Sequence, residues 1–385
     1  MRTRRSVAGL LLLAFIFLIY QVPVAAAESA ASNLNIKAES YVLIDADSGK
    51  ILCAKDEHKK LPPASMTKLM TLILAAEALD KGKANLKDKV ITSENAWKMG
   101  GSQVYLEPGE TMSLEDMLIA VAVGSANDAS VAVAEHLEGT QQDFVNLMNK
   151  KAGMLGLKDT NFVNCYGLPA NQHYTSAYDM AVMARYALHY PRILEYTSIK
   201  EYNLREGAFK LFNTNKLLWW YQGADGFKTG WTNEAKYCLT ATAKRNGLRL
   251  IAVVMASPET RGHFRDSMEL FNYGFAKYAY KTFFTKDNVC GVVQVGKGVN
   301  DMVEAVAEED VGAIYMKGDD AKITSEKHLL KYINAPVKKG QKLGEISIYK
   351  NGELQKKVNL NAARDIPKSG MIREIIKMFA EIFTL

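Results

Sequence analysis

The sequence predicts an α/β fold of the α+β type, with one antiparallel sheet packed against helices and a small all-β domain after it. Three observations lead to this prediction. Strand patterns at residues 41–54 and 226–256 bracket a region of helical periodicity from about residue 65 to 190. Short strand patterns then continue alone through residues 287–365. Because apolar faces must cover one another, the bracketing strands are expected to share a single sheet under the helices.

The strands of the first region are predicted from their turns. Residues 41–45 and 50–54 are short, largely apolar runs typical of strands, and the Asp- and Gly-containing stretch 45–49 supplies turn residues between them. Two longer strand patterns flank Asn246-Gly247, a strong signal for a tight hairpin. The region from 34 to 280 is therefore expected to form one domain.

The helices of this region are predicted from cap residues. Ser113 precedes an apolar helical run and is followed three residues later by Asp116, which is a capping-box-like pair. Ser176 and Asp179 repeat the arrangement before another helical run. Such serines accept hydrogen bonds from backbone N–H groups that a helix start leaves free.

The C-terminal part of the chain has a different sequence pattern. Residues 287–365 contain short strand patterns without helical periodicity, and Asn351-Gly352 closes another predicted hairpin. A small all-β domain is expected here.

Both ends of the chain suggest contact with membranes or export. Residues 1–27 have a basic start, an apolar run and an Ala-x-Ala end, which predicts a secretory signal peptide, with an uncleaved anchor as the alternative. Residues 369–385 form an amphipathic helical pattern that either packs on its own domain or lies in the membrane surface. We expect an exported protein held at the outer face of the cytoplasmic membrane, in the cell wall space.

Composition excludes several functional classes. The formal charge of +6 falls to +3 without residues 1–27, and no Lys/Arg block follows, so nucleic-acid binding has little support. The four cysteines form no Cys-x-x-Cys or zinc-like cluster, so a metal site is not expected. Buried free thiols are the favoured interpretation of these cysteines.

Ser65 and Lys68 are the first candidate catalytic residues. They lie three positions apart after Pro62 and Pro63, and near a helix start this spacing would let the amine reach the hydroxyl. A serine needs a base to become a useful nucleophile, and lysine can serve if burial or a nearby positive charge lowers its pKa. Taken alone, Ser-x-x-Lys is a weak motif.

Two further clusters raise its significance. Ser125 and Asn127 lie in a glycine-preceded segment between predicted helices, and the Lys228–Gly230 triplet Lys-Thr-Gly lies on a predicted strand. Ser-x-x-Lys, Ser-x-Asn and Lys-Thr-Gly in this order are typical of penicillin-binding proteins and related β-lactamases. Together the three motifs are highly specific.

Further segments make the resemblance narrower. "PASMTKLMT", "NFVNCYGL", "HYTSAYDMA" and "DGFKTGWTNEAKYCL" resemble signatures of exported D-alanyl-D-alanine carboxypeptidases, the low-molecular-mass penicillin-binding proteins. The resemblance covers about residues 35–280, and the β domain and amphipathic tail resemble that family's extensions. It implies the penicillin-recognising serine acyl-transferase fold, with no cofactor. It also implies a peptidoglycan stem peptide ending in D-Ala-D-Ala as substrate and β-lactams as covalent inhibitors.

The resemblance also implies roles for individual residues. Ser65 would be the nucleophile, Lys68 its base, and Ser125 the residue that passes a proton to the leaving D-alanine. The substrate-binding residues would be Asn127, Lys228, Thr229, Gly230 and Trp231, with the N–H groups of Ser65 and Trp231 forming the oxyanion hole. An arginine for the terminal carboxylate stays open among Arg261 and Arg265, with His263 near the expected position.

Two alternatives remain at this stage. A class A-like β-lactamase would share the three motifs but would need a glutamate to activate the deacylating water, and no glutamate occurs between Glu138 and Glu195. A non-catalytic sensor or scaffold of the same fold would not need the nucleophile and base that this chain retains.

Overall fold

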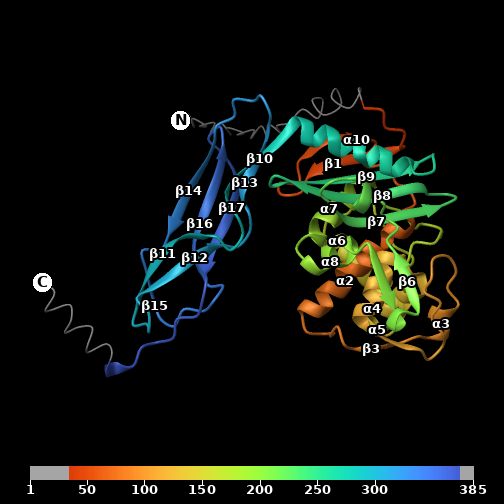
Figure 1. Cartoon of the computed structure of the whole chain (residues 1–385), viewed down its shortest axis with the longest axis horizontal. Helices are drawn as coiled ribbons and strands as arrows, with labels where there is room; N and C mark the ends of the chain where they lie inside the picture. The colour runs from red at the N-terminus through yellow and green to blue at the C-terminus, as the bar shows by residue number, and fades with distance from the viewer. Residues whose placement is uncertain (1–33, 373–385) are drawn as a thin grey trace, which may run out of the picture.

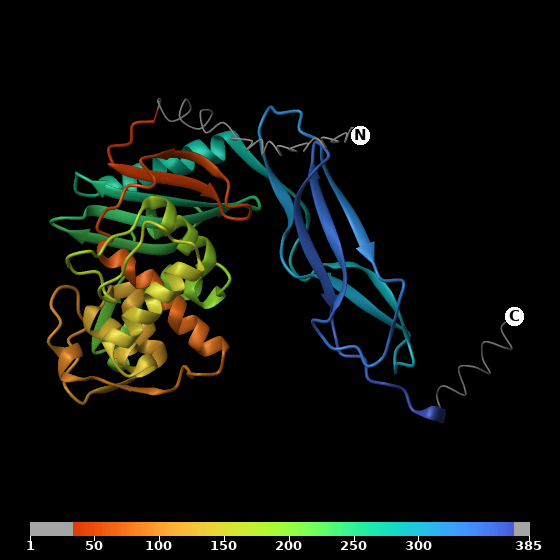
Figure 2. The same cartoon turned by 180° about the vertical axis from the view of Figure 1, so that it is seen from behind.

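The computed structural model describes residues 34–372 of the 385-residue chain. A sheet-and-helix domain lies beside an elongated β domain in both views (Figures 1 and 2). The predicted signal peptide at 1–27 and most of the predicted helix at 369–385 fall outside the described residues. No helix between residues 34 and 372 combines the length and apolar character needed to cross a bilayer.

The central sheet of the first domain joins the two ends of that domain. Its five antiparallel strands have the order β2-β1-β9-β8-β7. They are β1 (Ser40–Asp45), β2 (Ile51–Lys55), β7 (Ala224–Thr232), β8 (Lys236–Arg245) and β9 (Leu248–Ser257). Early and late strands therefore share one sheet, as predicted.

Both faces of this sheet are covered. Val42 and Ile44 of β1 belong to the core under the helical lobe, whereas Leu43 between them belongs to the core under α10 (Gly262–Lys277). Successive side chains of a strand point to opposite faces, which explains why these strands are continuously apolar. Figure 1 shows α10 on one side of the sheet and the helices of residues 68–198 on the opposite side.

The helical lobe surrounds one buried helix. Residues Lys68–Glu77 of α2 are all buried, so this helix has no solvent face over that length. The rest of the lobe is formed by α3 (Glu94–Trp97), α4 (Leu114–Ile119), the π-helical turn η2 (Ala120–Gly124), α5 (Asn127–Glu138), α6 (Gln141–Met154), α7 (Ala177–Ala187) and α8 (Pro191–Ser198). The short helix α9 (Leu217–Trp220) belongs to the other side, since Leu217 is part of the core under α10. The predicted caps are confirmed, since Ser113 Oγ accepts from Asp116 N and Ser176 Oγ from Asp179 N.

Two small antiparallel strand pairs lie within the helical region and just after it. One pairs β3 (Lys89–Ile91) with β4 (Thr111–Ser113), and the other pairs β5 (Glu201–Leu204) with β6 (Phe209–Phe212) across the turn η3 (Arg205–Gly207). These strands are not predicted from the sequence, because three or four residues give too short a period-2 pattern.

The β domain contains only strands within the described residues. A six-stranded sheet has the order β14-β16-β17-β12-β11-β15, and a separate pair joins β10 to β13. The bounds are β10 (Tyr278–Phe284), β11 (Val289–Gly296), β12 (Met302–Ala307), β13 (Val311–Met316), β14 (Ile323–Leu329), β15 (Tyr332–Asn334), β16 (Lys342–Lys350) and β17 (Glu353–Ala362). An apolar core of its own confirms the predicted all-β domain.

Polar contacts tie the two domains together near their common strand β10. Tyr280 donates a hydrogen bond to Asp47 Oδ2 at 2.9 Å, and Lys356 of β17 forms an ion pair with the same carboxylate. Lys244 at the end of β8 pairs with Asp310 at 2.8 Å. Asp47 lies in the turn between β1 and β2, so the β domain is anchored to the central sheet.

Candidate active site

Ser65 and Lys68 lie where the chain enters the buried helix. A short 3₁₀ turn, η1 (Ala64–Thr67), precedes α2 (Lys68–Asp80), so Ser65 lies one turn before the α-helix proper. Lys68 Nζ is 3.0 Å from Ser65 Oγ. Ser65 is partly exposed, whereas Lys68 is fully buried. The hydroxyl can therefore be reached from solvent while the amine cannot.

Two carbonyl oxygens hold the Lys68 amine in place. Its Nζ lies 2.6 Å from Asn127 Oδ1 and 2.6 Å from the Tyr166 carbonyl oxygen. Asn127 Nδ2 donates to Gly100 O at 2.6 Å, which fixes the amide so that its oxygen faces the lysine. The Ser-x-Asn segment thus meets the Ser-x-x-Lys segment at the lysine amine.

The pKa values of two lysines are lowered in this site. Burial, and next the positive charge of Lys228, hold the pKa of Lys68 well below its usual range. Burial lowers the pKa of Lys228 to about 7. Removal from water disfavours the charged form of an amine, and a like charge nearby disfavours it further. Both effects favour the neutral form of the Lys68 amine, which is the form that can accept a proton.

Ser125 is presented by an unusual turn. It follows the π-helical turn η2 and has φ of 61°, a left-handed conformation that non-glycine residues seldom adopt. Its N–H donates to Ala120 O, and Asn127 two residues later begins α5. Ser125 is 4% exposed. Strained backbone of this kind is concentrated at functional sites.

The Lys-Thr-Gly segment lies on β7, the edge strand that faces η1. A Cβ added to Gly230 would lie 2.8 Å from Pro63 O and 3.1 Å from Ser65 N, so only glycine allows this approach. Thr229 donates to Thr214 Oγ1 at 2.7 Å, and the Trp231 side chain is 55% exposed. The backbone of β7 thus runs directly past the serine.

The loop at residues 161–168, to which the sequence assigned no role, completes the site. Asn164 Oδ1 accepts from Gly167 N at 2.6 Å, and its Nδ2 donates to Leu168 O at 2.9 Å, so one amide ties the loop together. Gly167 has φ of +92°, and a Cβ there would lie 1.9 Å from Ala64 O. The loop delivers the Tyr166 carbonyl to Lys68. A backbone acceptor has no residue-type signature, so only the Asn-x-x-Gly spacing hinted at this role.

His173 stabilises the turn η1, which carries Ser65. Its Nδ1 accepts from Val163 N at 2.9 Å, so Nε2 carries the proton and faces Thr67 Oγ1 at 2.8 Å. Thr67 in turn donates to Ala64 O at 2.8 Å. Burial lowers the pKa of His173 to about 4, which keeps it neutral. These contacts give His173 a structural role beside η1.

The three candidates for binding a carboxylate differ in their charge and in whether an acidic side chain already pairs with them. Arg265 is paired with Glu259 at 2.6 Å and Asp266 at 3.1 Å. Burial lowers the pKa of His263 to about 4, so this ring, stacked on Tyr237, carries no charge. Arg261 is exposed at the start of α10 and lies 5.8 Å over the Trp220 ring. Among these three, Arg261 is the cation that no acidic side chain of the described chain engages.

The four cysteines are free and buried, as the sequence analysis favoured. Cys165 lies next to the Tyr166 carbonyl, but burial raises the pKa of its thiol to about 12. It is therefore a packing residue rather than a second nucleophile.

An antiparallel sheet with helices on both faces brings three distant motif segments to one buried amine beside a serine. This architecture and site define the class of penicillin-recognising serine enzymes. Residues 26–259 match the family model for D-alanyl-D-alanine carboxypeptidase, and residues 278–368 match the model for the C-terminal domain of penicillin-binding protein 5. The chain belongs to the D-alanyl-D-alanine carboxypeptidase family.

Individual relatives agree with this assignment. The chain is 44% identical to the carboxypeptidase DacF of Bacillus subtilis, over 89% of each chain. It is 33% identical to DacC of Escherichia coli, over 94% of this chain and 92% of the relative. Penicillin-binding protein 5 from Haemophilus influenzae has a similar structure, with a TM-score of 0.66, 34% identity and coverage of 86% and 98%. Penicillin-binding protein D2 from Listeria monocytogenes, solved in its ampicillin-bound form, matches with a TM-score of 0.58 and 32% identity over 63% of this chain and 99% of that one.

The protein is therefore a hydrolase of the serine-type D-Ala-D-Ala carboxypeptidase class. The two alternatives left open by the sequence, a class A-like β-lactamase and a non-catalytic scaffold, find no support in these matches.

Proposed function

We propose that this chain removes the terminal D-alanine from peptidoglycan stem peptides through an acyl-enzyme on Ser65. The observation that carries the proposal is the 3.0 Å contact between Ser65 Oγ and the buried Lys68 amine, whose pKa is strongly lowered. This pairing gives a hydroxyl the adjacent base that a serine nucleophile requires.

In the acylation step, Ser65 Oγ attacks the carbonyl carbon between the last two D-alanines as Lys68 Nζ takes the hydroxyl proton. A neutral amine has two N–H donors and one lone pair. The carbonyls of Asn127 and Tyr166, each 2.6 Å away, can take both donors, which leaves the lone pair for the Ser65 hydroxyl. The negative charge that develops on the carbonyl oxygen would be bound by the N–H groups of Ser65 and Trp231.

Collapse of this intermediate breaks the peptide bond. The leaving nitrogen takes a proton through Ser125, replaced from the Lys68 ammonium, and Lys228 keeps this hydroxyl network near a positive charge. Thr229 and Arg261 are our choices for holding the terminal carboxylate, and Asn127 would contact the substrate amide. Water then attacks the ester carbonyl, with Lys68 taking its proton, and releases the shortened peptide from Ser65.

β-Lactams are expected to acylate the same serine. The decisive test compares wild type with Ser65→Ala, using D-alanine release from diacetyl-Lys-D-Ala-D-Ala and intact-mass detection of a benzylpenicillin adduct. We expect both signals in wild type and neither in the variant. Since Ser65 is partly exposed, loss of one hydroxyl should leave the melting temperature nearly unchanged. Undiminished D-alanine release by Ser65→Ala would refute the assignment.

The pH dependence of acylation tests the role of the lysines. Protonated Lys68 cannot accept a proton, so the rate of benzylpenicillin acylation should fall as the pH is lowered through its pKa. The charge on Lys228 lowers that pKa, so Lys228→Gln should raise it and move the acidic limb of the profile to higher pH. The measurement is the second-order acylation rate constant from pH 5 to 10, and an unmoved limb would contradict the coupling.

We also propose that the chain is exported and acts at the membrane surface. The supporting observations are the signal-peptide pattern at 1–27 and the amphipathic pattern at 369–385, around domains that we place at 34–280 and 287–365. Strand β10 bridges the gap between those two domains by pairing with β13. A protein truncated after Pro367 should lose most of its partitioning to phospholipid vesicles. Equal partitioning of truncated and intact protein would remove the tail from this role.

A further inference from the structure

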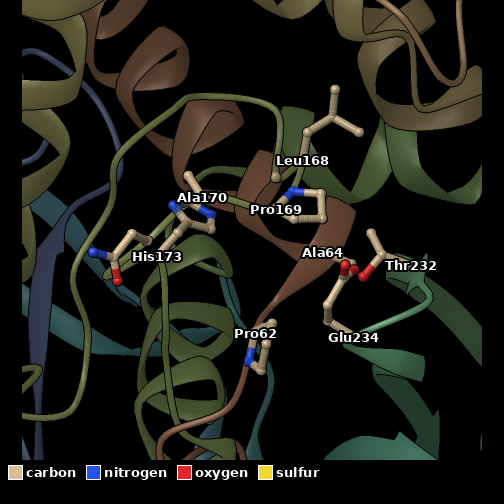
Figure 3. Close-up of a pocket in the computed structure, with 10 residues that line it drawn as sticks. Pro62, Ala64, Leu168, Pro169, Ala170, His173, Thr232 and Glu234 are labelled. Atoms are coloured by element: carbon tan, nitrogen blue, oxygen red, sulfur yellow. The ribbon is translucent and has the colours of Figure 1, made fainter.

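The pocket at the active site is lined by residues of the first domain. They lie between Pro62 and Glu234, from the approach to η1 to the turn after β7 (Figure 3). The mechanism proposed above therefore assigns no task to the β domain. One end of that domain has a concentration of positive charge that the mechanism does not use.

Three loops meet at this end, where the described chain stops. Ser369 N donates to Lys297 O at 2.9 Å, and Lys339 N donates to Asp365 Oδ1 at 2.7 Å, so the last loop is bonded to both of the others. Figures 1 and 2 show this end of the β domain away from β10 and the first domain. We define the tip of the β domain as the loops after β11, β15 and β17, residues 297–301, 335–341 and 363–370.

The tip is strongly basic. It contains five cations and two carboxylates, which gives a net charge of +3. The chain after residue 27 also has a net charge of +3, so all other residues of that part sum to zero. The cations of the tip, all exposed, are Lys297, Lys338, Lys339, Arg364 and Lys368.

The positive charges of the tip are not neutralised by the protein. No carboxylate in residues 34–372 forms an ion pair with any of the five side chains. Lysines on the strands of the same domain differ in this respect. Lys357 pairs with Glu345 at 2.7 Å, and Lys356 pairs with Glu309 at 3.2 Å. The tip cations are therefore available to an anionic partner outside the chain.

The position of the tail indicates which partner the tip meets. The amphipathic pattern at 369–385 begins inside the last loop of the tip, so a tail lying in a membrane surface brings the tip to the lipid headgroups. In the tail itself, Arg373 and Lys377 are balanced by Glu374 and Glu381, so its net charge gives no preference for anionic lipids. An anionic surface attracts nearby lysines by about fivefold per residue.

We propose that the tip of the β domain binds anionic phospholipid headgroups through its five cations. This contact adds a charge-dependent attraction to the apolar burial of the tail, and two such signals attach a protein more firmly than one. The inference rests on the proposed membrane location, because insertion of the tail is what brings the tip to the lipid.

The test measures partitioning of the chain from Glu28 onward to two kinds of vesicle by co-sedimentation. One contains equal parts of phosphatidylglycerol and phosphatidylcholine, and the other contains phosphatidylcholine alone. We expect wild type to prefer the anionic vesicles by at least about 10-fold at low salt, and this ratio to shrink as salt is raised. Most of the ratio should disappear in the tip variant, which combines Lys297→Gln, Lys338→Gln, Lys339→Gln and Lys368→Gln.

The matched control removes four exposed lysines outside the tip, none of which pairs with a carboxylate of residues 34–372, and so has the same net charge as the tip variant. It should keep the wild-type ratio, and both variants should keep benzylpenicillin labelling, which verifies that the first domain is folded. The control combines Lys83→Gln, Lys87→Gln, Lys286→Gln and Lys322→Gln.

Several results would overturn the proposal. They are a wild-type ratio of 1, a ratio that survives in the tip variant, and an equal loss in the control, which would make net charge rather than the tip responsible. Tip-dependent binding to soluble polyphosphate without a preference between the vesicles would assign the tip to an anionic polymer instead. If wild type bound neither vesicle, the proposed membrane location itself would fail.

Discussion

Replacement of Lys68 by methionine is expected to lower the rate of benzylpenicillin acylation by about 10²- to 10⁴-fold, the usual contribution of a positioned general base. Methionine keeps a long apolar stem in the buried helix but removes the amine that lies 3.0 Å from Ser65 Oγ. The carbonyls of Asn127 and Tyr166 would lose their shared partner at the same time. Stopped-flow measurement of acylation gives the rate.

Lys68→Arg separates a base from a merely structural cation. Arginine keeps the positive charge and the hydrogen-bond donors, but its pKa is too high for it to become neutral. If Lys68 acts as a base, arginine therefore cannot restore the acylation rate. We expect Lys68→Arg to be about as slow as Lys68→Met. Acylation by Lys68→Arg at a near wild-type rate, with a normal thermal transition, would show that Lys68 only positions Ser65.

Gly167→Ala is expected to produce the second large effect, on both stability and acylation. The new Cβ would lie 1.9 Å from Ala64 O, and φ of +92° is unfavourable for any residue with a Cβ. The loop must move away from η1, which carries the Tyr166 carbonyl away from Lys68. We expect a loss of about 1–3 kcal/mol in unfolding free energy from the backbone strain alone, before the clash is counted. Urea unfolding and benzylpenicillin labelling measure the two effects.

Gly207→Ala is the matched control for this variant. Gly207 has φ of +99°, close to that of Gly167, but a Cβ there would meet nothing within 4 Å. It should show the backbone strain without the clash, and acylation should stay near wild type. If Gly167→Ala were no worse than Gly207→Ala in either measurement, close contact between the loop and η1 would not matter for the site.

Much of the fold could be predicted because local sequence patterns indicate its strands, turns and helix starts. The strands around residues 41–54 and the hairpin at Asn246-Gly247 follow from short apolar runs and turn residues, and the caps at Ser113 and Ser176 from their hydroxyls. The small hairpins β3–β4 and β5–β6 could not be predicted in this way. Their strands are too short for periodicity and are held by contacts with neighbouring loops, such as Arg205 with Glu110 at 2.8 Å.

The residues of the candidate site could likewise be predicted only in part. Motif spacing was enough to single out Ser65, Lys68, Ser125, Asn127 and the Lys228–Gly230 triplet, because chemistry restricts which side chains can serve there. It could not identify the Tyr166 and Gly100 carbonyls, since any residue supplies a backbone oxygen. It could not choose between Arg261, His263 and Arg265 either. That choice depends on the ion pairs of Arg265 and on the stacking of His263 on Tyr237, a residue of strand β8.

The sequence by itself determined the class of enzyme, because three short motifs in a given order restrict the reaction that their side chains can perform. Tertiary structure alone decided whether Lys68 could act as a base. The pKa of an amine depends on how much water surrounds it and on the charges nearby. Here the helical lobe excludes water from Lys68, and the nearby charge is that of Lys228, on a strand far away in sequence. Segments far apart in the chain create that environment, so no local pattern could encode it.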